Sequence, residues 1–176
     1  MISTSSNRTG EKPPGILDDV DPGIRSAAFV VDLPPEEDPE LCIPTVEKGL
    51  SFIRLTTPTS DDKRLPKLVQ NTSGFVYYVS VAGVTGAGSA SNDQIVEAMG
   101  RLRRHTDLPI AVGFGIKTAE QAADVAKQAD AAVVGSAIVS KIAESLDENG
   151  KATDKTASMV TGLVRELANG VRNARK

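Results

Sequence analysis

Short apolar runs alternate with amphipathic stretches along most of this chain. Each run is rich in β-branched or aromatic residues, and each is followed by residues whose apolar positions recur at helical spacing. The predicted strands span 27–33, 51–55, 75–80, 109–112 and 131–134. A final amphipathic helix carries Val160, Leu163, Val164, Leu167 and Val171. Strands that alternate with helices predict a parallel sheet, and nearly continuous apolar strands are typical of a sheet covered on both faces.

Polar residues mark where several helices begin. Ser91 with Gln94, and Thr118 with Gln121, have the spacing of a capping box. After the second box, one stripe of alanines at 122, 126 and 129 predicts the buried face of a helix. The segment 61–70 is predicted to be helical although it contains Pro66.

The N-terminal part of the chain differs in composition from the rest. Residues 1–26 are rich in Ser, Thr, Pro, Gly and Asp, which predicts a disordered or irregular arm. The remaining residues, 27–176, are predicted to form one domain. Early in this domain, Asp38 followed by proline predicts a capped helix start, and Gly49 predicts the end of that helix.

Composition narrows the classes of function. The chain has 176 residues and a formal net charge of −3, without a basic cluster, which argues against a nucleic-acid partner. A single cysteine allows no internal disulfide, and Cys42 is predicted to be a small core residue. No apolar run has membrane-spanning length, and the first residues lack the pattern of a signal peptide. We therefore expect a cytoplasmic protein without a membrane partner.

Glycines end three of the predicted strands. Gly83 and Gly86 follow one strand, Gly113 and Gly115 follow the next, and Gly135 with Ser136 follows the last. Glycine lets backbone N–H groups approach an anion without a Cβ between them, and the start of a helix attracts negative charge. Each cluster alone is explained by a tight turn. Three in succession favour a phosphate-binding site at the carboxyl ends of parallel strands.

Five motifs carry a resemblance to a known family. They are VVDLPPEE at 30–37, GFVYYVS at 74–80, GVTG at 83–86, GFG at 113–115 and VGSAIV at 134–139. In this order they resemble the tryptophan synthase alpha subunit from about its fourth barrel strand onward. The resemblance implies the fold class: α/β, a partial TIM (β/α)8 barrel of about five parallel strands with flanking helices, lacking the first three βα units.

The same resemblance implies a substrate and a site. The family cleaves indole-3-glycerol phosphate to indole and glyceraldehyde 3-phosphate in L-tryptophan biosynthesis. By resemblance, the substrate phosphate would be held by Gly86, Gly115, Gly135 and Ser136. The indole pocket would be lined by Tyr77, Thr85, Phe114 and Val133. The implied partner is the tryptophan synthase beta subunit, which holds the pyridoxal phosphate, so this chain is expected to need no cofactor of its own and no metal.

The resemblance leaves the proton-transfer groups unassigned. The family's catalytic glutamate and aspartate lie in the part that the resemblance does not cover, and Val81 stands where the family usually has an arginine. A positioned acid or base typically contributes about 10² to 10⁴-fold to a rate. We therefore expect no catalytic residue here and little turnover by the chain alone. The alternatives are a non-catalytic half-barrel that binds phosphate or the beta subunit, and a different phosphate-handling barrel enzyme such as a sugar-phosphate isomerase.

Overall fold

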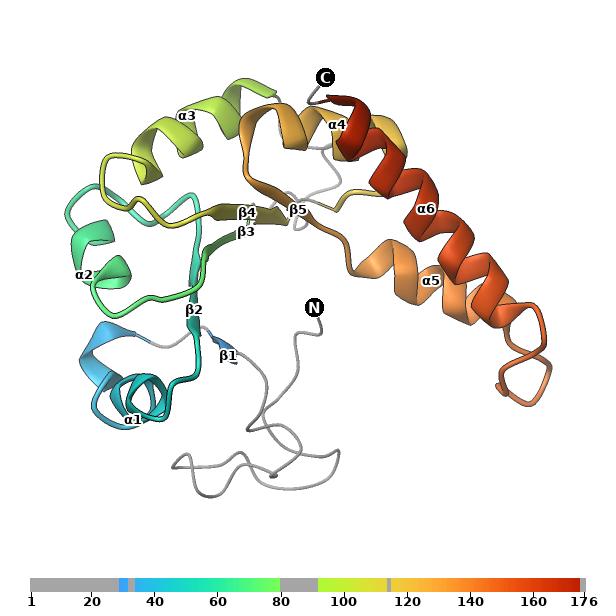
Figure 1. The fold of residues 1–176 in the computed structure, drawn as a ribbon, viewed down its shortest axis with the longest axis horizontal. Helices are drawn as coiled ribbons and strands as arrows, with labels where there is room; N and C mark the ends of the chain where they lie inside the picture. Colours follow the sequence, from blue (N-terminus) through green and yellow to red (C-terminus); the bar gives the residue numbers. More distant parts are fainter. Residues whose placement is uncertain (1–28, 32–33, 80–91, 114, 175–176) are drawn as a thin grey trace. The chain divides into compact units, whose positions relative to one another are not determined.

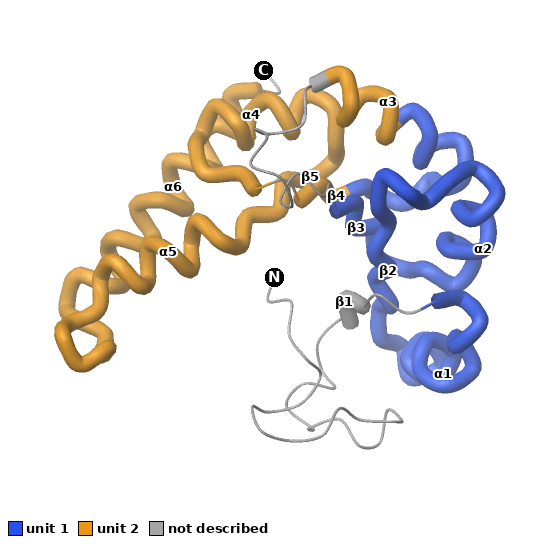
Figure 2. The backbone as a smooth tube through the Cα atoms, turned by 180° about the vertical axis from the view of Figure 1, so that it is seen from behind, with its two compact units in different colours: residues 1–79, 100–110 blue, residues 80–99, 111–176 orange. Residues whose placement is uncertain are grey.

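The computed structural model describes residues 29–31, 34–79, 92–113 and 115–174 (Figure 1). Within the chain there are two compact units, one formed by 1–79 with 100–110 and the other by 80–99 with 111–176 (Figure 2). The arm predicted at 1–26 lies outside the described residues. Along the chain the elements are β1 (Phe29–Val31), the 3₁₀ helix η2 (Pro35–Glu37), α1 (Cys42–Glu47), β2 (Phe52–Thr56), α2 (Leu65–Val69), β3 (Val76–Val79), α3 (Asn92–Leu102), β4 (Ile110–Gly113), α4 (Ala119–Gln128), β5 (Ala131–Val133), α5 (Ser136–Ser145) and α6 (Thr156–Ala174).

The first unit is built on parallel strands, as the sequence predicts. Strand β2 pairs with β1 on one side and with β3 on the other, and Arg54 is the β2 residue opposite Val76 of β3. The N–H of Val76 in turn donates to the carbonyl of Pro109, which directly precedes β4 (N to O, 2.9 Å). Helices α1 and α2 both pack against β2. Apolar side chains from these elements form the core, among them Cys42, Phe52, Ile53, Leu65, Leu68 and Val76.

The helix predicted to begin at Asp38 is shorter than expected. A 3₁₀ turn ends at Glu37, and α1 begins only at Cys42, with Leu41 at its N-cap and no side-chain cap. The prediction that Asp38 caps this helix is therefore wrong, because its buried carboxylate pairs with Arg54 instead. The predicted helix end is confirmed: Gly49 has φ +77° and its N–H donates to the carbonyl of Val46 (2.9 Å).

The helix predicted over 61–70 is also shorter in the structure. Helix α2 begins at Leu65, and Pro66 lies in its first turn, where a missing N–H costs no hydrogen bond. The Asp61 carboxylate accepts hydrogen bonds from the N–H groups of Lys63 and Arg64 (3.1 and 2.9 Å), which makes a turn before the helix. A side chain that bonds nearby backbone in this way competes with helix formation.

In the second unit, β4 and β5 pair in parallel and α4 packs against both β5 and α6. The capping box at Thr118 is confirmed: its hydroxyl accepts from the Gln121 N–H, and the Gln121 side chain accepts from the Thr118 N–H. The predicted alanine stripe of α4 is buried as well. In α6, Leu167 is buried but Val164 is 44% exposed, so the expectation that Val164 belongs to the packed face is wrong.

Strand β5 departs from the expected burial. All of β4 is buried, whereas Ala131 of β5 is exposed and the two residues after it are half-buried.

Among the described helices, none is both long enough and apolar enough to cross a membrane.

Candidate functional site

The register of β4 and β5 brings two of the predicted phosphate-binding loops to one edge of the sheet. Gly113, the last residue of β4, is paired with Val133, the last residue of β5. Gly115 stands two residues beyond the first of these, and Gly135 two residues beyond the second. Because the strands are parallel, both loops leave the sheet at its carboxyl edge. This edge is where ligands bind in parallel α/β folds.

Both glycines leave room beside the backbone. Gly115 has φ +62°, a conformation that residues with a side chain rarely adopt, and a Cβ built on it would meet no atom within 4 Å. Gly135 is the N-cap residue of α5 and has the same open space around it. The structure therefore has, at these two positions, the exposed backbone that an anion site requires.

The start of α5 is uncapped by any side chain. The carbonyl of Gly135 accepts from the N–H groups of Ile138 and Val139 (3.0 and 3.1 Å), and no side chain of the described residues bonds to the first amides of the helix. Ser136 is exposed at this position. Amides at a helix start point outward and carry partial positive charge, which suits a phosphate oxygen.

A cavity of about 700 Å³ opens beside the start of α5. Its wall comes from the turn after β4 and from α5 and α6, all within the second unit. The charged residues that line it are Lys117, Lys141, Glu144 and Glu166. Ser136, one of the predicted phosphate-binding residues, is part of the same wall.

The predicted indole pocket is only partly described. Tyr77 is half-buried on β3 in the first unit, and burial raises the pKa of its hydroxyl, which keeps it protonated. Val133 is half-buried on β5 in the second unit. Gly86, Thr85 and Phe114 lie outside the described residues, so the pocket and the third glycine loop stay predictions.

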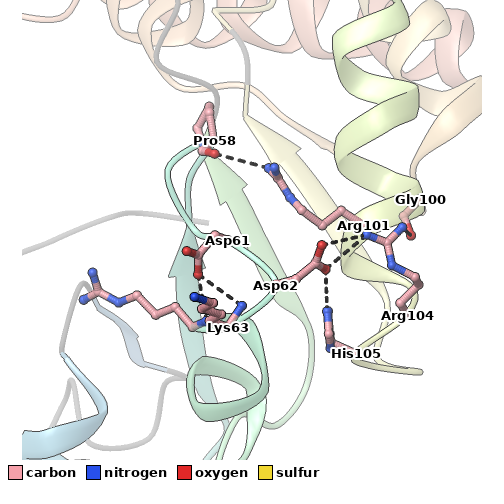
Figure 3. A network of polar contacts seen from close by, with 9 residues as sticks. Pro58, Asp61, Asp62, Lys63, Gly100, Arg101, Arg104 and His105 are labelled. Carbon is pink, nitrogen blue, oxygen red and sulfur yellow. Dashed lines mark hydrogen bonds and ion pairs between the residues drawn. The ribbon is translucent and has the colours of Figure 1, made fainter.

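A cluster of charges in the first unit was not foreseen from the sequence (Figure 3). The Asp62 carboxylate accepts from the Arg104 guanidinium (3.0 and 3.1 Å) and lies 2.7 Å from Nε2 of His105. The hydrogen bond with His105, which has the larger influence, and those from Arg104 hold the pKa of Asp62 below its usual value. The pairing of His105 with this carboxylate is a long-range contact. No local pattern could reveal it, because the partners are 43 residues apart.

The described residues offer no metal site. Within them, no group of three or more His, Cys, Asp or Glu side chains is placed to hold an ion. Cys42, the lone cysteine, is fully buried. Burial raises the pKa of its thiol, and the negative charge of the nearby Asp38 carboxylate raises it further. Cys42 is a core residue, as the sequence predicted.

Comparison with known proteins settles the family. The model of the tryptophan synthase alpha chain family matches residues 21–171. The chain belongs to this family. The tryptophan synthase alpha subunit from Legionella pneumophila str. Paris is 30% identical, with a TM-score of 0.70 over 84% of this chain and 52% of that one. Mycobacterium tuberculosis tryptophan synthase in space group F222 is 33% identical, with a TM-score of 0.70 over 85% and 53%.

The extent of these matches agrees with the predicted fold class. The chain spans about half the length of the tryptophan synthase structures that it matches. Its described strands are parallel and are flanked by helices, as in part of a TIM barrel. The predicted partial (β/α)8 barrel is thus confirmed.

Proposed function

We propose that this chain acts in tryptophan synthesis by binding indole-3-glycerol phosphate through its phosphate group, at the amides that follow β4 and β5. The observation that carries this proposal is the pairing of Gly113 with Val133, which sets Gly115 and Gly135 at matching positions beyond two neighbouring strands. Membership of the tryptophan synthase alpha chain family supports the choice of ligand. Gly86 would complete the phosphate contacts.

The binding step is tested with glycerol 3-phosphate, which carries the phosphate without the indole. We expect saturable binding, with the largest NMR shifts at the backbone amides of Gly115, Gly135 and Ser136. Glycerol, which lacks the phosphate, is the matched ligand control and should produce none of these shifts. Shifts that never saturate, or that lie on other elements, would contradict the proposal.

A charge at the helix start gives a second test. Ser136→Asp places a carboxylate where the phosphate would lie, and we expect it to abolish glycerol 3-phosphate binding. The same change stabilises a helix start through the helix dipole, so the protein should stay folded. Ala157→Asp is the control, because it adds the same charge to the exposed first turn of α6, outside the cavity. Equal binding by Ser136→Asp and the unaltered protein would contradict the proposed site.

Turnover is a separate question from binding. The retro-aldol step needs one group to take the glycerol hydroxyl proton and another to protonate the indole carbon. The resemblance assigns neither role to a residue of this chain, and phosphate binding orients a substrate without moving those protons. We therefore expect no indole release from indole-3-glycerol phosphate by the chain alone. Measurable indole release by the purified chain would favour a complete lyase site.

We further propose the tryptophan synthase beta subunit as the partner, on the strength of the family. Co-sedimentation of the chain with a purified beta subunit tests this. A shift of both proteins into one boundary is the expected result, and two independent boundaries at micromolar concentration would contradict it. The partner would supply the pyridoxal phosphate, for which we expect no site in this chain.

A further inference from the structure

Two lysines line the cavity beside the start of α5, and they differ in their partners. The Lys141 ammonium forms an ion pair with the Glu144 carboxylate, one turn along α5 (2.6 Å). Lys117 forms no ion pair with any residue in the described part of the chain, and its side chain is exposed to the cavity. A lysine that lines a cavity without a carboxylate partner has its positive charge available for an anion.

Hydrogen bonds to the Gln121 side chain fix the backbone at Lys117 and Thr118. The Gln121 side-chain oxygen accepts from the Lys117 N–H (2.7 Å) as well as from the Thr118 N–H (3.2 Å). This turn begins at Gly115, only two residues before Lys117. The side chain therefore starts from a fixed point beside the predicted phosphate contacts, which lowers the cost of placing it.

The other charged residues that line the cavity leave Lys117 as the side chain that would balance the charge of a bound anion. Glu144 is already neutralised by Lys141, while Glu166 lines the cavity from α6 and would oppose an anion. Backbone amides carry only partial charge, so a dianion beside a carboxylate gains from a full positive charge on the same wall. Lys117 is the lysine available to supply it.

We propose that Lys117 is a binding residue for the phosphate, donating from its ammonium to a phosphate oxygen held at the start of α5, so that the site selects phosphomonoester dianions. This inference rests on the proposed function, since it concerns the same phosphate. It adds a side-chain contact to the backbone contacts. It also predicts that the charge of Lys117 makes the affinity for the phosphate more sensitive to ionic strength.

The experiment compares glycerol 3-phosphate binding by calorimetry in matched variants. Lys117→Gln should weaken binding about tenfold, the size expected for one partly exposed charged hydrogen bond. Lys117→Arg should restore most of the affinity, and Lys117→Glu should weaken it further than glutamine does. Lys151→Gln is the control, because it removes the same charge from an exposed loop residue that does not line the cavity.

Salt gives a second readout that a purely structural role of Lys117 would not change. The affinity of the unaltered protein should fall more steeply with added salt than that of Lys117→Gln. Equal affinity and equal salt dependence in these two proteins would overturn the role of Lys117 while leaving the backbone site intact. Absence of saturable binding in the unaltered protein would overturn both this inference and the proposed function. Circular dichroism of each variant confirms that the fold is retained.

Discussion

The Asp38 carboxylate and the Arg54 guanidinium form an ion pair inside the first unit, and their side chains are only 6% and 1% exposed. Asp38 follows η2, whereas Arg54 lies in the middle of β2. The same carboxylate accepts from the Asn71 amide (2.8 Å), and the guanidinium lies over the Phe52 ring, 5.2 Å from its centroid. This pair therefore joins the loop after β1 to the central strand of the unit.

Removal of one partner of this pair should destabilise the protein strongly. Arg54→Met leaves the Asp38 carboxylate buried without its cation, and we expect the free energy of unfolding to fall by about 3–5 kcal/mol. Urea denaturation followed by circular dichroism measures the change. The double variant Asp38→Asn, Arg54→Met should be clearly more stable than the sum of the two single effects predicts, because it leaves no unpaired charge. Strict additivity would show that the two side chains do not act as a pair.

The close approach between α4 and α6 leaves no room for a side chain at Gly170. A Cβ on Gly170 would lie 2.2 Å from the carbonyl oxygen of Ala119, which belongs to the backbone and cannot turn away. We expect Gly170→Ala to lower the free energy of unfolding by about 1–3 kcal/mol through forced separation of the helices. Gly162→Ala is the control on the same helix: no atom lies within 4 Å of its added Cβ, and alanine favours a helix by about 1 kcal/mol. Equal stability of the two variants would contradict this packing.

The left-handed conformation of Gly115 should matter for binding more than for folding. Gly115→Ala forces an alanine to φ +62°, at a cost of about 1–2 kcal/mol, and its methyl group enters the space proposed for the phosphate. We expect a small loss of thermal stability with a large loss of glycerol 3-phosphate affinity. Gly150→Ala is the matched control, since Gly150 also has a positive φ (+72°) and open space but lies in the loop between α5 and α6. Its stability should fall similarly while its affinity stays unchanged; equal losses of affinity would point to a general effect of strain.

The Asp62 cluster should make stability depend on pH in the acidic range. The pKa of Asp62 is lowered in the folded protein, so its ionised form is favoured by folding. The stabilisation is therefore fully present above the ordinary aspartate pKa of about 4 and is lost as the pH falls through the lowered value. Asp62→Asn should lower the melting temperature near neutral pH, and the difference from the unaltered protein should close below about pH 4.

Asp154→Asn serves as the control for this pH dependence. Asp154 is an exposed aspartate that forms no ion pair within the described residues, so its replacement should leave the melting curve nearly unchanged at every pH. A constant difference between Asp62→Asn and the unaltered protein across the acidic range would contradict the role given to the Asp62 charge.

The sequence by itself determined the element types, the parallel sheet and the family. Apolar runs identified the strands, the pair Thr118 and Gln121 identified a helix start, and Gly49 a helix end, because each of these signals acts within a few residues. The strand-end clusters that contain Gly115, Gly135 and Ser136 are also visible in the sequence alone, whereas the indole-pocket residues follow only from the family resemblance.

The tertiary structure decided which distant residues meet. Asp38 has the local features of a helix cap, yet its carboxylate pairs with Arg54, a buried arginine 16 residues later in the chain. Val164 matched the helical period but lies on a face that no neighbouring element covers fully. The register of β4 against β5 placed Gly115 and Gly135 at one edge, and the packing of α5 beside the turn after β4 placed Lys117 in the same cavity as Ser136. Local patterns cannot contain such facts, because a side chain's partners depend on where the rest of the fold brings opposing charge and volume.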